Sequence, residues 1–165
     1  MESLLIISNT TPLINFAEIG RMDLLEDLFG SLVIPPAVVS ELTGKSGLFP
    51  QAAQVPSLGC ISMRPPSDQL LVKSLASQVH PGEAECLVLA MEHPGSLLLL
   101  DDLGAREFAA SNGLLYTGTL GCLSEARKRG LISAIGPLLQ ELRTKARFWI
   151  ADRLEDRVLR DVGEK

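Results

Sequence analysis

Two adjacent aspartates, Asp101 and Asp102, follow directly on four leucines in the segment SLLLLDDLGAR. An apolar run without polar alternation predicts a strand covered on both faces, as in the parallel sheet of an α/β protein. Because open α/β sheets bind ligands beyond the carboxyl ends of their strands, the two carboxylates are well placed for chemistry. Asp is also common at helix starts, so capping of the helix that follows is an alternative role for one of the pair.

Two further polar side chains follow apolar segments. Asn9 comes directly after the strand-like run at residues 4–8, and Glu41 falls in the last turn of a helix expected over 35–44. Each of the two follows an apolar element, as a shared site requires, so we expect both side chains to share a site with the aspartates.

Glu83 lies in the helix-like segment HPGEAECLVLAMEH, with apolar residues four, seven and eight positions further on. This spacing places Glu83 on the helix stripe that faces the sheet. Glu85 lies about 200° further round the helix and points elsewhere. A carboxylate in the first helical turn is also favoured by the helix dipole alone, which is the alternative reading of Glu83.

Carboxylates gathered without His or Cys are typical ligands of Mg²⁺ or Mn²⁺, which prefer oxygen donors. Such ions let a protein hydrolyse phosphodiesters at neutral pH, because they activate water and neutralise charge on the leaving oxygen. His80 and His93 lack a ligand partner at useful spacing, so we assign them helix-boundary roles and expect no zinc.

Composition is that of a compact protein, with 46% hydrophobic and 21% charged residues among 165. We expect one domain, residues 1–165, without a signal peptide or membrane span and located in the cytoplasm. Cys60, Cys86 and Cys122 are too few and too widely spaced for a disulfide framework, and we interpret them as core thiols. A net charge of −5 argues against binding of nucleic acid by overall electrostatic attraction but permits an acidic metal site.

Apolar runs alternate with helical patterns along the chain, which predicts a three-layer α/β domain with about five parallel strands. The segment 44–59 is rich in Gly, Pro and Ser, and we interpret it as a mobile loop with room for one helical turn and as a candidate flap facing the substrate. Expected strands cover residues 4–8, 32–34, 60–63, 96–100 and 114–117, and expected helices cover 12–29, 35–44, 68–78, 80–93, 103–112 and 119–129. Residues 148–150 suggest a short strand or extended piece before a charged helix.

Three basic residues, Arg127, Lys128 and Arg129, end the last of these helices. Cations in a final helical turn are ordinary, because they complement the helix dipole. Together with Arg143, Lys145 and Arg147 they would instead form a basic rim for RNA, if the helix end lies near the acids.

The ordered motifs SNTTPLINFAEIGRMDLLEDLFG, VIPPAVVSEL, HPGEAECLVLA, LLLLDDLGAREFA and TGTLGCLSEARKRGLI resemble the PIN-domain superfamily. Within it, the chain is similar to the small prokaryotic proteins grouped with VapC-type toxins, over roughly residues 6–149. The resemblance implies a sheet in strand order 3-2-1-4-5, with an acidic pocket beside the central strand.

The resemblance also implies a set of site residues. Glu41, Glu83 and Asp102 correspond to the second, third and fourth acidic positions and would hold Mg²⁺ or Mn²⁺, with Asp101 as an auxiliary ligand. Asn9 stands where the family usually has its first acid, and we expect its amide to bond to a pocket carboxylate or hydroxyl. The hydroxyls expected to orient water or phosphate are Thr10 and Thr119.

The resemblance thus implies a metal-dependent endoribonuclease acting on RNA, as the toxin of a toxin–antitoxin pair, with a small antitoxin protein as partner. We also expect a homodimer without membrane association. The alternative, raised by Asn9, is a catalytically weak or inactive PIN-like protein that binds RNA or a protein partner through the same cleft. A dinucleotide-binding regulator is disfavoured, because no GxGxxG follows the first strand.

Overall fold

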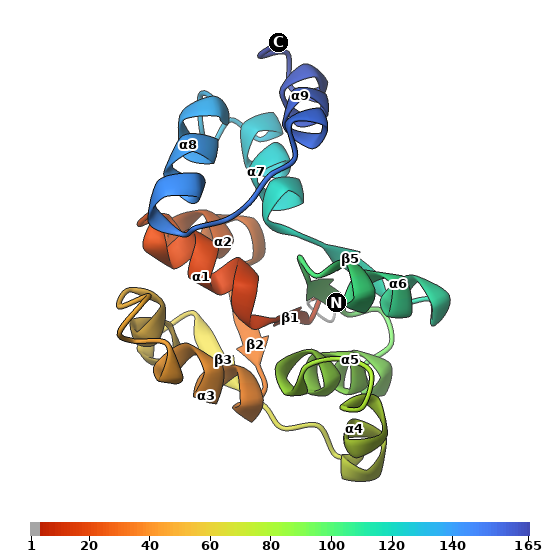
Figure 1. The fold of residues 1–165 in the computed structure, drawn as a ribbon. Helices are drawn as coiled ribbons and strands as arrows, with labels where there is room; N and C mark the ends of the chain where they lie inside the picture. Colours follow the sequence, from red (N-terminus) through yellow and green to blue (C-terminus); the bar gives the residue numbers. More distant parts are fainter. Residues whose placement is uncertain (1–3) are drawn as a thin grey trace.

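The centre of the fold is a five-stranded parallel sheet in the order β3-β2-β1-β4-β5, seen in a computed structural model that describes residues 4–165 (Figure 1). The strands are β1 (Ile6–Ser8), β2 (Leu32–Ile34), β3 (Ile61–Met63), β4 (Leu97–Leu99) and β5 (Leu115–Thr117). The central strand β1 pairs with β2 on one side and β4 on the other. The expected sheet and its strand order are confirmed.

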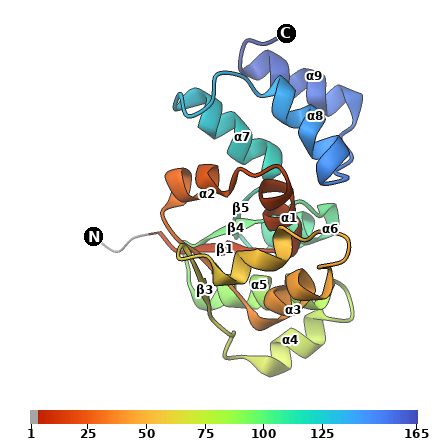
Figure 2. The same ribbon diagram turned by 90° about the vertical axis from the view of Figure 1, so that its left-hand side faces the viewer.

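Helices cover both faces of this sheet, which gives the expected three-layer architecture. The α-helices are α1 (Thr10–Glu18), α2 (Met22–Phe29), α3 (Pro36–Gly44), α4 (Gln69–Leu75), α5 (Pro81–Glu92), α6 (Leu103–Ser111), α7 (Thr119–Lys128), α8 (Gly136–Lys145) and α9 (Asp152–Asp161). In Figure 2, α1 and α2 lie on one side of the sheet, and α4 and α5 lie on the other. Helices α7, α8 and α9 stack beyond α1 and α2, further from the sheet.

The leucine run forms β4 and its exit, and Leu98, Leu99 and Leu100 are all fully buried. Burial on both faces explains why the run carries no alternating polar residues. Helix α5 packs against β1, β4, α3, α4 and α6, and most of its residues are buried. Its apolar surface is therefore wider than the single stripe that the sequence spacing suggests.

Two segments differ from the expectation. The helix expected over 12–29 is divided, because α1 ends at Glu18 and Gly20 turns the chain at a φ of +69° before α2 starts. The segment 44–59 contains a helical turn, the 3₁₀ helix η1 (Ala52–Ser57), but it is packed more closely than a free loop, because η1 contacts α1, α3 and β3. Phe49, Ala52 and Val55 are buried there, so apolar anchors hold this segment on the body of the protein.

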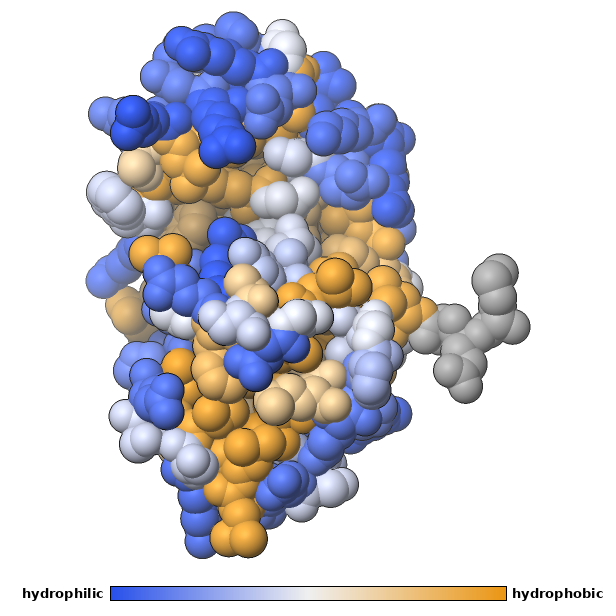
Figure 3. All heavy atoms as spheres, turned by 90° about the vertical axis from the view of Figure 1, so that its right-hand side faces the viewer, coloured by the Kyte–Doolittle hydropathy of each residue, from blue (hydrophilic) through white to orange (hydrophobic). Residues whose placement is uncertain are grey.

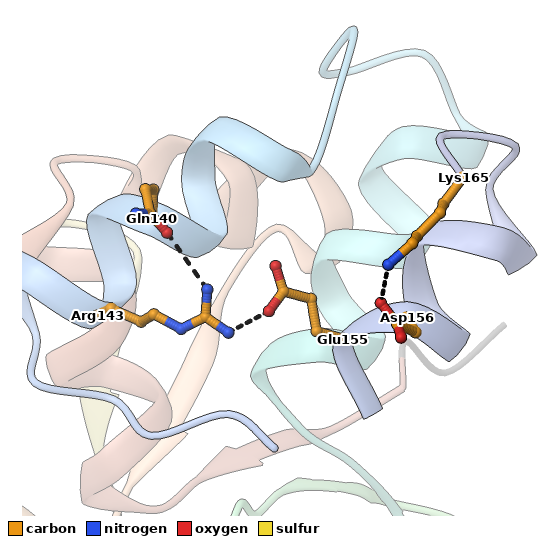
Figure 4. A network of polar contacts seen from close by, with 5 residues as sticks. All are labelled: Gln140, Arg143, Glu155, Asp156 and Lys165. Carbon is orange, nitrogen blue, oxygen red and sulfur yellow. Dashed lines mark hydrogen bonds and ion pairs between the residues drawn. The ribbon is translucent and has the colours of Figure 1, made fainter. Parts of the chain in front are cut away.

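Charged side chains connect helices α8 and α9 and the carboxyl-terminal residues that follow them (Figure 4). Arg143 of α8 donates to Glu155 of α9, and Lys165 pairs with Asp156. The carboxylate of Glu164 accepts hydrogen bonds from the first backbone N–H groups of α8, at Ile135 (2.8 Å) and Gly136 (3.1 Å). These contacts hold both helices that flank the connecting segment 146–151. Helix α8 was not anticipated from the sequence.

The face that carries α6, β5 and α4 shows several patches of apolar side chains, separated by polar ones (Figure 3). Exposed apolar residues on these elements are Leu70, Leu103 and Leu115. Within residues 4–165, none of the helices has the length and hydropathy that a bilayer crossing requires.

Candidate metal centre

An open pocket of about 630 Å³ lies beside the carboxyl ends of β1 and β4. It is where the separate polar positions of the sequence come together, because parallel strands end at a common edge. Of the seven residues predicted for the site, six line this pocket: Asn9, Thr10, Glu41, Glu83, Asp101 and Asp102. The seventh, Thr119, is fully buried and lies behind Asp101, to which it is hydrogen-bonded.

Glu41 reaches the pocket from α3 and is held there on both carboxylate oxygens. The hydroxyl of Thr10 donates to Oε2, and the backbone N–H of Gly82, at the start of α5, donates to Oε1 at 3.1 Å. A Cβ atom at position 82 would stand 2.7 Å from that oxygen, so glycine is required for the carboxylate to approach. Thr10 therefore positions Glu41, and its expected contact with water or phosphate stays a prediction.

Glu83 points from α5 into the pocket and is only 6% exposed. Its burial raises the pKa of the carboxyl above the ordinary value, and the negative charges of Asp102 and Glu41 raise it further. Glu85 faces another way and accepts a hydrogen bond from the N–H of Ala37, in the first turn of α3, at 3.0 Å. The expected difference in orientation between the two glutamates is thus seen.

Asp101 is tied to the start of α7. Its oxygens accept the backbone N–H of Thr119 at 2.8 Å and the Thr119 hydroxyl at 2.6 Å. Burial raises the pKa of the Asp101 carboxyl, and the bonds from Thr119 partly offset that rise. Asn15 of α1 was missed by sequence reasoning, although it is a polar residue on an apolar helix face, and its Nδ2 donates to the Thr119 hydroxyl at 3.0 Å.

Asp102 serves as the N-cap of α6, where its Oδ2 accepts the backbone N–H of Ala105 at 2.9 Å. The capping alternative therefore applies to Asp102. Since the same side chain also lines the pocket, capping and ligand binding are both open to it.

Asn9 follows β1 directly and is 4% exposed. Within the described part of the chain, its Oδ1 is buried without a hydrogen-bond donor, so the expected bond from a pocket hydroxyl to this oxygen is not formed. A buried acceptor left unpaired costs about 1–3 kcal/mol. In a pocket lined by carboxylates, a cation is the natural partner for such an oxygen.

The donor set fits a hard divalent cation, since carboxylate and amide oxygens dominate the pocket. However, no three His, Cys, Asp or Glu side chains among residues 4–165 stand close enough to hold one ion as they are. Glu41, Asp101 and Asp102 are each engaged in hydrogen bonds within the protein. An ion shared between these carboxylates would compete with those bonds, which predicts modest affinity.

Besides His80, four other residues line the pocket that sequence reasoning did not place there: Thr11, Lys45, Phe148 and Trp149. The last two lie on the connection between α8 and α9, which is extended without pairing as a strand. His80 also lines the pocket and stands at the N-cap of α5, while His93 stands at its C-cap. Both histidines thus lie at helix boundaries, as expected.

The basic residues 127–129 lie at the far end of α7 from Thr119. A helix of this length spans about 15 Å, so the cluster is remote from the acids. Arg129 pairs with Glu125 at 2.8 Å, and Arg127 lies 3.7 Å from Glu164. The reading as ordinary helix-end charge is therefore the one that the geometry favours.

The sheet order and the acidic pocket at the strand ends agree with what the resemblance to PIN domains implies. The chain belongs to the PIN-domain family, because the family model described as a PIN domain matches residues 5–164. PIN domains are generally nucleases that depend on divalent metals. No curated protein gives a significant match to the chain.

The two neighbouring glutamates provide a matched test of the pocket. We expect Glu83→Gln to weaken Mn²⁺ binding by about tenfold or more, because a full ligand charge is lost at nearly constant shape. Glu85→Gln should leave affinity unchanged, since a glutamine oxygen still accepts the N–H of Ala37. Isothermal titration calorimetry with Mn²⁺ measures the affinity of both variants. A larger loss of affinity in Glu85→Gln than in Glu83→Gln would show that Glu83 is not part of the site.

Proposed function

We propose that this protein is a Mg²⁺- or Mn²⁺-dependent endoribonuclease whose metal site is the pocket at the ends of β1 and β4. The observation that carries the proposal is the unpaired buried oxygen of Asn9 among pocket carboxylates. Membership of a family of metal-dependent nucleases supports it.

In this proposal each residue has a defined task. Glu41, Glu83 and Asp102 would hold the cation through carboxylate oxygens, and Asn9 would add its amide oxygen. The bound ion would supply an activated water and neutralise charge on the phosphodiester. Thr10 fixes one oxygen of Glu41. Asp101 is an auxiliary ligand, and its contacts with Thr119 set the position of α7.

The test is cleavage of single-stranded and structured RNAs by the purified protein with Mg²⁺, with Mn²⁺ and with EDTA. We expect internal cleavage only when a divalent ion is present. Cleavage that persists unchanged in EDTA would refute the proposal.

The second candidate is a catalytically weak PIN protein that binds RNA or a protein partner through the same pocket. Asn9 favours it, because an amide brings no charge to the position where the family usually has its first acid. RNA binding by the pocket, without cleavage under any metal condition, would establish this alternative.

A role as the toxin of a toxin–antitoxin pair, acting in the cytoplasm, remains part of the proposal and rests on the resemblance to VapC-type proteins. It predicts that expression arrests cell growth and that a small antitoxin protein relieves the arrest. A homodimer likewise remains part of the proposal, and the exposed leucines Leu70, Leu103 and Leu115 are candidate contacts for a second copy.

A further inference from the structure

The mouth of the pocket carries an exposed tryptophan. Trp149 is 82% exposed, lines the pocket, and is the single tryptophan in the chain. Its neighbour Phe148 is half-buried and lines the same pocket. Aromatic residues form only 4% of the sequence, so two consecutive rings beside the candidate metal centre call for a functional explanation. Exposed indole faces bind other flat, apolar surfaces.

An unusual backbone conformation precedes the two rings. Arg147 adopts a φ of +56° and is the one residue other than glycine with positive φ among residues 4–165. Phe148 then donates its N–H to the carbonyl of Leu142 at 3.0 Å, which folds the chain back over the end of α8. Elsewhere glycine takes this conformation, as Gly113 does after α6. A bulky residue in the left-handed region carries strain, and such strain gathers at binding sites.

Two cations accompany the rings. Lys45 lines the pocket, and Arg147 is exposed directly beside Phe148. Neither side chain takes part in an ion pair within the described residues. Both charges are therefore available to phosphate groups, although the pocket floor is acidic and the chain as a whole carries a net charge of −5.

We propose that Trp149 and Phe148 form a stacking subsite for an unpaired base of a single-stranded RNA, with Arg147 and Lys45 on the adjacent phosphates. Aromatic rings that alternate with cations are the usual means of binding single strands, because every base has a face that can stack. Bases inside a duplex are stacked on one another and cannot use the subsite. The subsite rests on the proposed function in that it places the strand across the carboxylate pocket.

The intrinsic fluorescence of the single tryptophan reports on the subsite directly. The probe is an unstructured RNA of about 12 nucleotides, added in EDTA so that no metal-dependent cleavage occurs. We expect the indole emission to fall on titration with the strand and to stay constant with the same RNA annealed into a duplex. A DNA strand of the same sequence should also quench, because stacking does not use the 2′-hydroxyl.

Substitutions at Trp149 and Arg147 distinguish the contribution of stacking to RNA binding from that of charge. Trp149→Ala should weaken binding of a labelled strand by about fivefold or more, and Trp149→Phe should retain most of the affinity. Arg147→Gly should keep the melting temperature, because glycine accepts the backbone conformation, yet lower the salt slope of binding by about 0.7. Leu4→Ala is the matched control, since Leu4 is 56% exposed and belongs to neither the pocket nor the acids.

Unchanged emission with the single strand, or equal affinity for Trp149→Ala and wild type, would overturn the subsite and leave a protein partner as the explanation for the exposed indole. Metal-dependent cleavage combined with unchanged emission would refute the subsite alone. Quenching without cleavage under any metal condition would support the subsite and refute the nuclease. When cleavage is seen, Trp149→Ala should raise KM more than it lowers kcat, because the ring positions substrate away from the reacting atoms.

Discussion

Replacement of Asp102 by asparagine is expected to lower RNA cleavage by at least about 100-fold, since charge stabilisation by a bound metal is worth several kcal/mol. The melting temperature should hardly change. The reason is that Asp102 caps α6 through the N–H of Ala105, and asparagine is an equally good N-cap. Cleavage kinetics and thermal unfolding of the same preparation provide the two readouts.

The control for this prediction is Asp102→Ala, which removes both the cap and the ligand. We expect it to lose cleavage and also to lose about 1 kcal/mol of unfolding free energy. If Asp102→Asn cleaves RNA at the wild-type rate, Asp102 is a helix cap and nothing more.

Restoration of an acid at position 9, in the variant Asn9→Asp, is expected to strengthen metal binding, whereas Asp102→Asn weakens it. Without metal, Asn9→Asp should lower the melting temperature, because a new carboxylate joins Glu41, Glu83 and Asp102 around one pocket. With Mn²⁺ it should bind the ion more tightly. At about 4 Å and an effective dielectric near 20, one charge contributes on the order of 4 kcal/mol per unit of ion charge, most of which desolvation and carboxylate repulsion offset.

Mn²⁺ titration and the RNA cleavage rate, each measured for wild type and Asn9→Asp, check this prediction. A gain in both supports a nuclease weakened by its amide. Tighter metal binding without cleavage by either form supports the binding protein. If neither quantity changes, Asn9 does not contact the metal, and its correspondence to the first acidic position must be withdrawn.

The sequence is most informative where the chain enters and leaves the sheet. The leucines before Asp101 predict a strand buried on both faces, and parallel strand ends share an edge, so Asn9 could be placed beside the two aspartates. Glu41 was assigned to the same pocket through the family resemblance. The phase of α5 also follows from the sequence, because a helix fixes the angle between Glu83 and Glu85. The strand order came from the family resemblance.

Other features could not be predicted because they depend on contacts between distant segments. The segment 44–59 has the composition of a loop, yet Phe49 and Val55 anchor it in the core. The approach of Trp149 to the pocket depends on how α8 and α9 fold back over the body, and no local pattern encodes that path. The hydrogen bonds of Thr10 likewise depend on where Glu41 arrives in space.

The location of bound Mn²⁺ tests the central claim most directly. Crystals of the protein soaked in Mn²⁺ and measured at a wavelength where manganese scatters anomalously would show where the ion binds. We expect the strongest anomalous peak in the pocket, in contact with carboxylate oxygens of Glu83 and Asp102 and with Oδ1 of Asn9. A well-occupied ion elsewhere, with the pocket free of manganese, would contradict the account.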